Sequence, residues 1–269
     1  MHVKGLLAAL ACISLALFSC GSNNDQTSGG TSNGASGQPT ELTVFAGSSL
    51  TAAFTQIGSD FEAANPGTTV TFNFGSSGDL AASIESEGTA DVFASASGTY
   101  MDEVSDKVGI SGRADFVQNK LVIITPPDNP ANITSLKDLA RPGVQVVLAA
   151  EGVPVGDYAR QSLESAGIKN DVLANVVSNE DDDASVVAKI TAGEADAAIV
   201  YVSDVTSSVA PEVASVGIPD DVNVIATYPI AVVSTSTHAE LAQAFVTYVT
   251  GSEGEATLAD FGFLPPPRS

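Results

Sequence analysis

The sequence predicts an α/β fold in which parallel strands alternate with helices. Two runs, at 120–125 and 144–149, are apolar almost throughout and lack the alternation of a half-exposed strand. Amphipathic stretches with helical spacing separate these runs from other strand-like segments. Strands buried on both faces and joined by helices are typical of sheets that helices cover on each side. The alternation therefore indicates α/β architecture with parallel sheets.

The first strand and helix are expected on either side of a turn in Val44–Thr51. The β-rich start of this stretch ends in small residues, and apolar residues then recur at helical spacing over 50–61. Ser48 and Ser49 thus fall at a helix start, where backbone N–H groups lack intrahelical partners. The partial positive charge of that end and a serine hydroxyl both favour an anion. Serine is also a common N-cap, so plain capping is the alternative interpretation.

A second unit of the same design follows directly. Thr68–Phe74 is β-branched and aromatic, and it runs into Gly75-Ser76-Ser77-Gly78, after which helical spacing resumes. Ser76 and Ser77 therefore sit at another helix start, and the two glycines let the backbone approach a ligand closely. Two strand–serine–helix units in succession indicate an anion site more strongly than one does.

The remaining elements are expected by the same criteria. Pro126 and Pro127 stop the strand at 120–125, and Pro154 suits the first turn of a helix because its missing N–H is harmless there. Further strands are expected at 90–95, 197–202, 222–226 and 228–233, and further helices at 100–108, 135–140, 154–166, 184–190, 239–249 and 254–261.

Residues 1–40 are expected to lie outside the folded domain. Lys4 and the apolar run 6–18 have the pattern of an export signal, and this run is too short to span a bilayer comfortably. Leu17-Phe18-Ser19-Cys20 resembles the lipobox of bacterial lipoproteins, which predicts a signal peptide at 1–19 and a lipid on Cys20. Residues 20–40 have the composition of a flexible tether. The alternative is an ordinary signal peptide with an incidental cysteine.

The chain is strongly acidic, with a formal net charge of −22. Loss of the signal with Lys4 leaves 9 basic and 32 acidic residues, a net charge of −23. A charge of this sign excludes nucleic-acid binding through phosphate neutralisation and mainly favours solubility. An anionic ligand would have to be held by local donors that overcome this field.

Five stretches, taken together and in order, resemble one family. They are Thr43–Leu50, similar to an opening strand and Ala-Ala-Ser-Leu turn; Phe74–Ala81, similar to a second Ser-rich turn; Val153–Ala159, similar to Val-Pro-Ala-Gly-x-Tyr-Ala; Ala198–Asp204, similar to Gly-Ile-Val-Tyr-x-Ser-Asp; and Tyr228–Val233, similar to a Tyr-Pro-Ile-Ala strand. These motifs resemble those of the extracytoplasmic molybdate-binding proteins of ABC transporters. The resemblance covers residues 41–265.

The resemblance implies a two-lobed periplasmic-binding-protein fold (type II), with two parallel or mixed sheets flanked by helices and a ligand cleft between the lobes. Residues 41–119 and 228–269 would form lobe 1, and residues 120–227 lobe 2. It also implies a monomer that is not an enzyme, uses no cofactor and delivers molybdate, or tungstate, to the permease of an ABC importer. The expected location is extracytoplasmic, at the membrane through the lipid on Cys20.

Carried over position by position, the family's oxyanion site falls on Ser49, Ser77, Val155, Asp183 and Tyr201. The serines would supply hydroxyl and backbone N–H groups, Val155 and Asp183 backbone N–H groups, and Tyr201 its phenolic O–H. These residues would hold molybdenum only as molybdate, by hydrogen bonds to its oxygen atoms. The first four also fall at helix starts expected from the pattern alone. At Asp183 the chain departs from the family's pattern of Val followed by Arg. A carboxylate at this position would repel a dianion, or it could cap its own helix.

Other functions stay open on the sequence. A fully deprotonated tetrahedral dianion only accepts hydrogen bonds, so neutral donors suit molybdate, tungstate and sulfate alike. Phosphate keeps a proton at neutral pH and needs an acceptor, which the acidic run 181–183 could provide. A serine hydrolase using Ser48 or Ser49 would lack a Gly-x-Ser-x-Gly elbow and have only His238 as a base beyond the signal. The acidic run lacks the alternating ligands of a calcium loop, and Tyr201 could serve in core packing alone.

Overall fold

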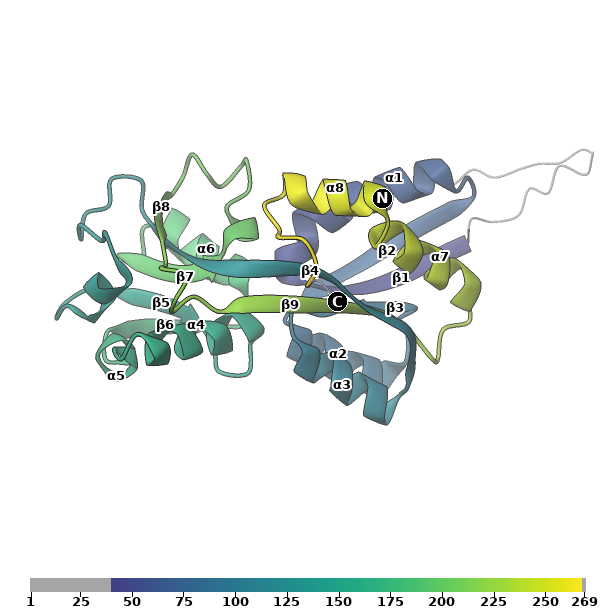
Figure 1. Ribbon diagram of the computed structural model, residues 1–269, viewed down its shortest axis with the longest axis horizontal. Coiled ribbons are helices and arrows are strands. Elements are labelled where there is room, and N and C mark those ends of the chain that lie inside the picture. The colour runs from purple at the N-terminus through teal and green to yellow at the C-terminus, as the bar shows by residue number, and fades with distance from the viewer. Residues whose placement is uncertain (1–39, 268–269) are drawn as a thin grey trace, which may run out of the picture. The chain divides into compact units, whose positions relative to one another are not determined.

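A computed structural model of the chain describes residues 40–267, which fall in one compact unit (Figure 1). The strands within these residues are β1 (Thr40–Gly47), β2 (Thr68–Gly75), β3 (Val92–Ala94), β4 (Ile110–Thr125), β5 (Val146–Ala149), β6 (Val176–Glu180), β7 (Ala197–Tyr201), β8 (Ala214–Gly217) and β9 (Ile225–Val233). They form a mixed sheet in the order β2-β1-β3-β9-β4-β7-β5-β6, and β8 pairs with β4 beside this path. Helices cover this sheet, so the predicted α/β class is confirmed.

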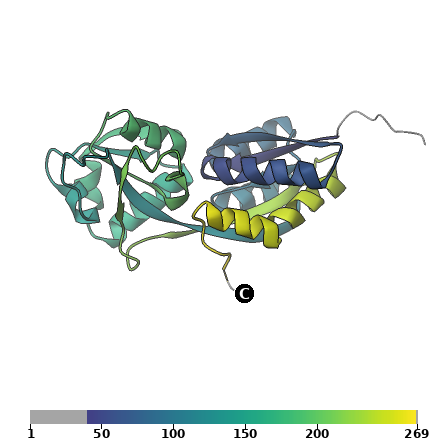
Figure 2. The same cartoon turned by 90° about the horizontal axis from the view of Figure 1, so that it is seen from above.

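The half of the sheet built from β1, β2, β3 and β9 lies between two layers of helices. β1 pairs in parallel with β2 and β3, and β9 runs antiparallel to β3. The helices of the first layer contact one another on one face (Figure 2), and those of the second layer contact each other on the opposite face (Figure 1). The first layer is α1 (Thr51–Ala64), α7 (Ala239–Val249) and α8 (Ser252–Asp260), and the second is α2 (Ser77–Glu87) and α3 (Gly98–Lys107).

The other half of the sheet contains β5, β6, β7 and β8. β5 pairs in parallel with β6 and β7, and β4 runs antiparallel to β7 and β8. α4 (Pro154–Ser165) and α6 (Asp183–Thr191) pack against β5 and β7 from opposite faces, and α5 (Lys169–Leu173) follows α4 (Figure 1). The helix expected at 135–140 is the short 3-10 segment η2 (Leu136–Ala140). Among residues 40–267, no helix combines the length and the apolar character needed to cross a membrane.

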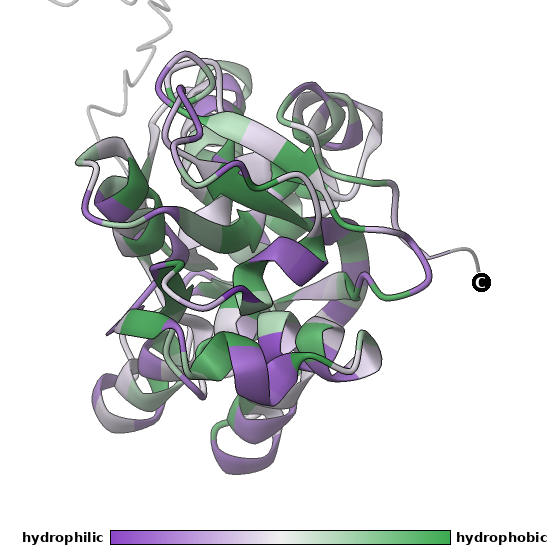
Figure 3. Ribbon diagram, turned by 90° about the vertical axis from the view of Figure 1, so that its left-hand side faces the viewer, coloured by the Kyte–Doolittle hydropathy of each residue, from purple (hydrophilic) through white to green (hydrophobic). Residues whose placement is uncertain are grey.

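The inner strands β3, β5 and β7 are buried on both faces, which explains why their sequences do not alternate. In β1, Val44 and Ala46 belong to the core under α1, whereas Phe45 between them belongs to the core under α2 and α3. Phe54 of α1 packs against aromatic rings from β2, β4 and α7, with centroids 5.9–6.2 Å apart. Figure 3 shows hydrophobic residues concentrated on the strands and hydrophilic residues on outward parts of the helices.

The two halves of the sheet are joined by β4 and β9. β4 pairs with β9 along residues 110–120 and then with β7 at Leu121–Ile124. The strand expected at 120–125 is therefore the end of a longer strand, whose first part is more exposed and carries polar residues. The strands expected at 222–226 and 228–233 correspond to the single strand β9, because Thr227 pairs with Gln118 without interruption. Residues 222–224 precede this strand, so the first expected strand began too early. The assignment of residues to two lobes stays a prediction.

Three elements had no clear sequence pattern: α5, β6 and β8. β6 lies at the edge of the sheet, and its residues alternate between half-buried and exposed, with polar residues in its second half. β8 has only four residues. Short edge strands bury too little apolar surface to leave a strong signal in the sequence. The predicted signal peptide at 1–19 and the predicted lipid on Cys20 lie outside the described residues. The same holds for the predicted linker 20–40, except for Thr40.

Candidate oxyanion site

All five residues predicted for the site line one small cavity. Its volume is about 10 Å³, which is roughly the space that one water molecule requires. The wall comes from the 3-10 segment η1 (Ser48–Leu50), from the starts of α2, α4 and α6, and from the end of β7. The lining residues are Gly47, Ser48, Ser49, Gly75, Ser76, Ser77, Ala96, Val153, Pro154, Val155, Asp183 and Tyr201.

Ser49 is oriented by a buried network of polar side chains. Its Oγ lies 2.9 Å from the hydroxyl oxygen of Tyr228. The Asn119 amide donates to that same Tyr228 oxygen at 3.3 Å and to Ser203 Oγ at 2.8 Å. Because Tyr228 accepts from Asn119, its own O–H is free to donate to Ser49. The Ser49 hydroxyl hydrogen then remains available to a group in the cavity.

Tyr228, Asn119 and Ser203 were not among the predicted site residues. Tyr228 belongs to a motif noted in the sequence, but its partner Asn119 is distant in the chain, on β4. Asn119 in turn donates to Ser203 of the 3-10 segment η3 (Val202–Asp204). Asn119 is fully buried at a point where β4 turns apolar. A polar residue entering an otherwise apolar strand is the one sequence signal that could have indicated a buried hydrogen-bond network.

Ser77 is held in place by the backbone of a neighbouring segment. Ser76 is the N-cap of α2, and its Oγ accepts from the backbone N–H of Asp79 at 3.3 Å. Ser77 follows as the first helical residue, and its Oγ accepts from the backbone N–H of Ala96 at 2.9 Å. A hydroxyl that accepts in this way keeps its own hydrogen to donate. Ser76 is thus the capping residue of α2, and Ser77 is free to offer its O–H to the cavity. At the first turn, the capping expected as the alternative for Ser48 and Ser49 is not observed, because the N-cap of η1 is Gly47 without a side-chain hydrogen bond.

Val155 lies in the first turn of α4, directly after Pro154. Its backbone N–H is among those that have no partner within the helix. The helix start packs tightly on the end of β5, because a Cβ on Gly156 would stand 2.3 Å from the carbonyl oxygen of Ala150. Arg160 reinforces this position by donating from Nη1 to the carbonyl oxygens of Ala149 and Gly156, at 2.8 and 2.9 Å. The Val155 N–H is therefore presented by rigid backbone.

Asp183 is the first helical residue of α6, and Asp182 is its N-cap. The Asp182 side chain accepts from the backbone N–H of Ser185 at 2.7 Å. The alternative in which Asp183 caps its own helix is therefore wrong. Asp183 is only 3% exposed. Its Oδ1 accepts from Ser48 Oγ, and its Oδ2 has no partner among the described residues.

A second carboxyl group, that of Asp204, lies near Asp183. Burial raises the pKa of Asp183 to about 6, although a hydrogen bond with the Asp204 carboxyl group opposes the increase. Burial and the neighbouring Asp183 raise the pKa of Asp204 well above its ordinary range, although its Oδ2 accepts from the backbone N–H of Tyr201 at 2.8 Å. Two carboxyl groups that are removed from water and close together do not readily both ionise. This pair therefore favours a shared negative charge over two separate ones.

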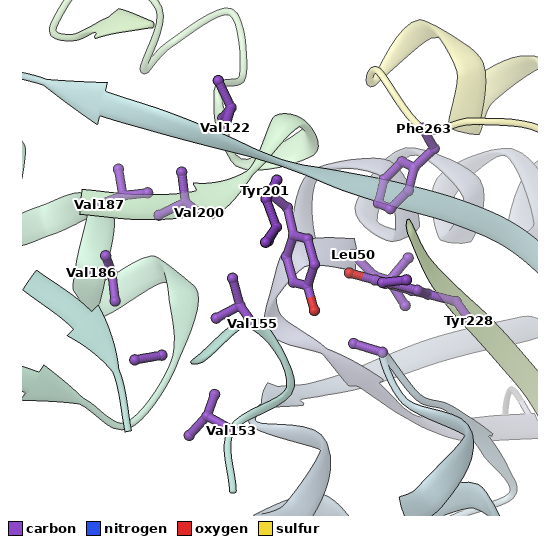
Figure 4. Packing of buried hydrophobic residues seen from close by; sticks show 14 of the residues in the cluster. Leu50, Val122, Val153, Val155, Val186, Val187, Val200, Tyr201, Tyr228 and Phe263 are labelled. Atoms are coloured by element: carbon purple, nitrogen blue, oxygen red, sulfur yellow. The ribbon is translucent and has the colours of Figure 1, made fainter. Parts of the chain in front are cut away.

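Tyr201 ends β7 and directs an unused donor toward the cavity. Its ring packs edge-on against Tyr228, with centroids 5.8 Å apart, and in Figure 4 its hydroxyl lies between Val155 and Tyr228. The hydroxyl is buried and has no partner among the described residues. Burial raises the pKa of the Tyr201 hydroxyl well above the ordinary value, so this group stays protonated. A hydrogen bond donated to a ligand would satisfy it. Core packing explains the ring, but it leaves the hydroxyl without a function.

The cavity wall has no Lys, Arg or His among the described residues. Its donors are serine and tyrosine hydroxyls and the N–H groups of helix starts, and its one carboxyl group is that of Asp183. His238 lies elsewhere, with Nδ1 3.5 Å from Asp91 Oδ1, so within residues 40–267 no histidine base accompanies Ser48 or Ser49. In the described part of the chain, no group of three or more His, Cys, Asp or Glu residues is placed to hold a metal ion. The arrangement is suited to a small anion that accepts hydrogen bonds.

Contacts close the cavity rim between the two halves of the sheet. The Tyr100 hydroxyl on α3 donates to the carbonyl oxygen of Gly152 before α4. The Tyr158 hydroxyl on α4 donates to the carbonyl oxygen of Ala96 at 3.5 Å. With the contact between Ser48 and Asp183, these bonds bring the serine-bearing turns against α4 and α6. The donors of both halves are thereby held around one small volume.

Comparison with known proteins relates the chain to one family. The chain matches the bacterial extracellular solute-binding protein family over residues 42–264. It is similar to the molybdate-binding protein ModA of Mycobacterium tuberculosis, with 39% identity over 97% of each chain. It is also similar to ModA of Escherichia coli, with 32% identity over 83% of this chain and 88% of the relative. The motif resemblance is thus confirmed.

The fold of solved structures supports the same relationship. The periplasmic molybdate-binding protein of Azotobacter vinelandii superimposes with a TM-score of 0.76, at 19% identity, over 84% of this chain and 100% of that chain. At such low identity this likeness concerns the fold alone. The relatives are binding proteins, which agrees with the expectation that the chain is not an enzyme. The chain belongs to the family of bacterial extracellular solute-binding proteins.

Proposed function

We propose that this chain captures molybdate, and tungstate by the same contacts, and delivers it to the permease of an ABC importer. The observation that carries this proposal is the convergence of Ser49, Ser77, Val155, Asp183 and Tyr201 on one cavity without a cationic side chain. A dianion that only accepts hydrogen bonds needs donors on every side, and this cavity supplies them. The names of the relatives at 39% and 32% identity support the same ligand.

Each of the five residues has a defined part in this proposal. Ser49 and Ser77 donate from hydroxyl groups whose own acceptor capacity is already occupied by Tyr228 and by the backbone of Ala96. Val155 and Asp183 donate backbone N–H groups from the first turns of α4 and α6, where the helix dipoles add partial positive charge. Tyr201 donates the buried phenolic O–H that lacks another partner. The ligand is held by hydrogen bonds, and no cofactor is involved.

We further propose that the protein acts as a monomer outside the cytoplasm, tied to the membrane by a lipid on Cys20. The support is the sequence Leu17-Phe18-Ser19-Cys20, followed by residues 21–40 with a tether-like composition. A tethered binding domain stays close to its permease, which raises the effective concentration of the loaded protein there.

Phosphate is the second candidate ligand, and Asp183 is the residue that favours it. Phosphate carries a proton at neutral pH, and the Oδ2 of a buried Asp183 without a partner could accept it. The neutral donors around it favour a fully deprotonated anion instead. Phosphate could therefore donate a hydrogen bond to Asp183, whereas molybdate can only accept one.

Calorimetric titration of the domain from residue 40 with molybdate, tungstate, sulfate and phosphate tests the proposal. We expect molybdate and tungstate to bind with similar affinity, because both are tetrahedral dianions that only accept hydrogen bonds. Phosphate should bind at least about a hundredfold more weakly, since an unpaired proton or acceptor inside the cavity costs about 2–3 kcal/mol. Preferred binding of phosphate would replace molybdate by the second candidate.

Replacing either serine should weaken binding while leaving the fold intact. Ser49→Ala and Ser77→Ala each remove one hydrogen bond to a charged ligand, worth about 1.5–3 kcal/mol, so molybdate affinity should fall roughly ten- to a hundredfold. The control is Ser59→Ala, which deletes an exposed hydroxyl on α1. Wild-type affinity in both site variants would remove these serines from the site.

Tyr201→Phe deletes one donor without changing the shape of the ring. We expect molybdate affinity to fall by about 1.5–3 kcal/mol and stability without ligand to change little or rise, because the lost hydroxyl has no partner in the protein. Tyr248→Phe on α7 is the matched control away from the cavity. A variant that binds like wild type would leave Tyr201 with a packing role only.

Cys20→Ala should release the protein from the membrane or block its processing. The thiol is the attachment point for the proposed lipid, and the tether beyond it offers no apolar anchor. Fractionation of cells and mass spectrometry of the purified N-terminus measure the two effects. A wild-type protein that carries no lipid, together with an unchanged distribution of the variant, would contradict the anchor.

A further inference from the structure

Asp183 is the one acidic residue that lines the cavity among the described residues, and this cavity is the place proposed for a dianion. It is 3% exposed, so water does not screen its charge. A carboxylate there would repel the ligand, whereas every other polar group of the wall is neutral. The site as built is therefore incomplete unless this charge is removed.

The two oxygen atoms of Asp183 have different surroundings. Oδ1 accepts a hydrogen bond from Ser48 Oγ, and Oδ2 is buried without a partner in residues 40–267. A bare carboxylate oxygen in such a place is costly, but a protonated oxygen becomes a donor. A hydrogen on Oδ2 would thus give the carboxyl group the same character as the hydroxyls of Ser49 and Tyr201.

The groups around Asp183 oppose its ionisation on balance. Titratable neighbours are Asp182 on α6, Asp204 on η3, Tyr201 at the end of β7 and Tyr228 on β9. The turn η1 adds the neutral Ser48, and β5 contributes only apolar residues. A hydrogen bond with the Asp204 carboxyl group and the backbone N–H groups at the start of α6 favour the ionised form, but burial outweighs them and raises the pKa of Asp183. No cation lines the cavity to reverse this balance.

We propose that Asp183 takes up one proton as the oxyanion binds, and that its neutral carboxyl group then donates a hydrogen bond to the ligand. The inference rests on the proposed function and adds to it a residue that couples affinity to pH. The pKa of Asp183 is already raised in the free protein, and the dianion raises it further. Affinity is therefore constant below the free-protein pKa, falls by up to about tenfold per pH unit above it, and levels off above the pKa of the complex.

Asp204 is the alternative site for the proton, because it lies beside Asp183 and its pKa is also raised. Its Oδ2 already accepts the backbone N–H of Tyr201, and it does not line the cavity. A proton on Asp204 would remove charge nearby but would give the ligand no new donor. The two carboxyl groups are separable by replacing each with its neutral amide.

Titration calorimetry with molybdate measures the proton directly. Binding is measured between about pH 6 and pH 9 in pairs of buffers that differ in ionisation enthalpy, and the heat difference gives the protons taken up. We expect proton uptake by wild type to rise from about pH 6 toward one proton and to fall again above the pKa of the complex. Asp183→Asn should take up none, with an affinity that no longer varies with pH. Asp181→Asn is the matched control, because it removes the same charge from an exposed position and should keep the uptake.

Each result decides the matter. Wild type that binds molybdate without proton uptake, or Asp183→Asn that retains the uptake, overturns the inference while leaving the proposed function in place. Uptake lost in Asp204→Asn and kept in Asp183→Asn assigns the proton to Asp204 and also overturns it. Folded wild type that binds no molybdate at any pH refutes the proposed function instead, and a thermal melt of the same sample establishes that it is folded.

Discussion

The site depends on the register between neighbouring parallel strands. Gly47 at the end of β1 pairs with Gly75 at the end of β2, so the serine-bearing turns that follow them must lie side by side. Ala149 of β5 pairs in the same way with Glu180 of β6, which places the starts of α4 and α6 together. Helix starts carry N–H groups without partners, and the paired strand ends gather them at one place. A shift of register would disperse these donors.

This constraint explains how much of the site could be predicted from the sequence. Ser49, Ser77, Val155 and Asp183 lie at the first helical turn after a strand, so local patterns place them at helix starts, and motif resemblance adds Tyr201. The supporting network escaped prediction because Asn119 and Tyr228 meet only through the pairing of β4 with β9. The full length of β4 escaped prediction for a related reason. Its first part is polar and more exposed, and it is a strand because it pairs with β9.

The acidic charge of the chain and the neutrality of the cavity are compatible because different residues determine them. A net charge of −22 spread over the surface is screened beyond about 10 Å at ordinary ionic strength, whereas donors in contact with a ligand are not. Asp183 is the exception, since it brings charge inside. Its side chain touches that of Ser48, whose Oγ donates to Asp183 Oδ1. The carboxyl group of Asp183 therefore has a hydrogen-bond donor, Ser48, for one of its two oxygen atoms.

The Ser49 network also ties ligand contact to the strands that join the halves of the sheet. Asn119 is on β4 and Tyr228 on β9, close to the residues where β4 changes partner from β9 to β7. Ser203 extends the network to η3 and donates to the carbonyl oxygen of Ser49 at 3.5 Å. Any displacement of one half against the other must bend β4 and β9 near these side chains. Because buried polar groups tolerate little loss of hydrogen bonding, such bending would change the orientation of Ser49. The donor geometry at Ser49 is therefore set by the same segments that hold the two halves together.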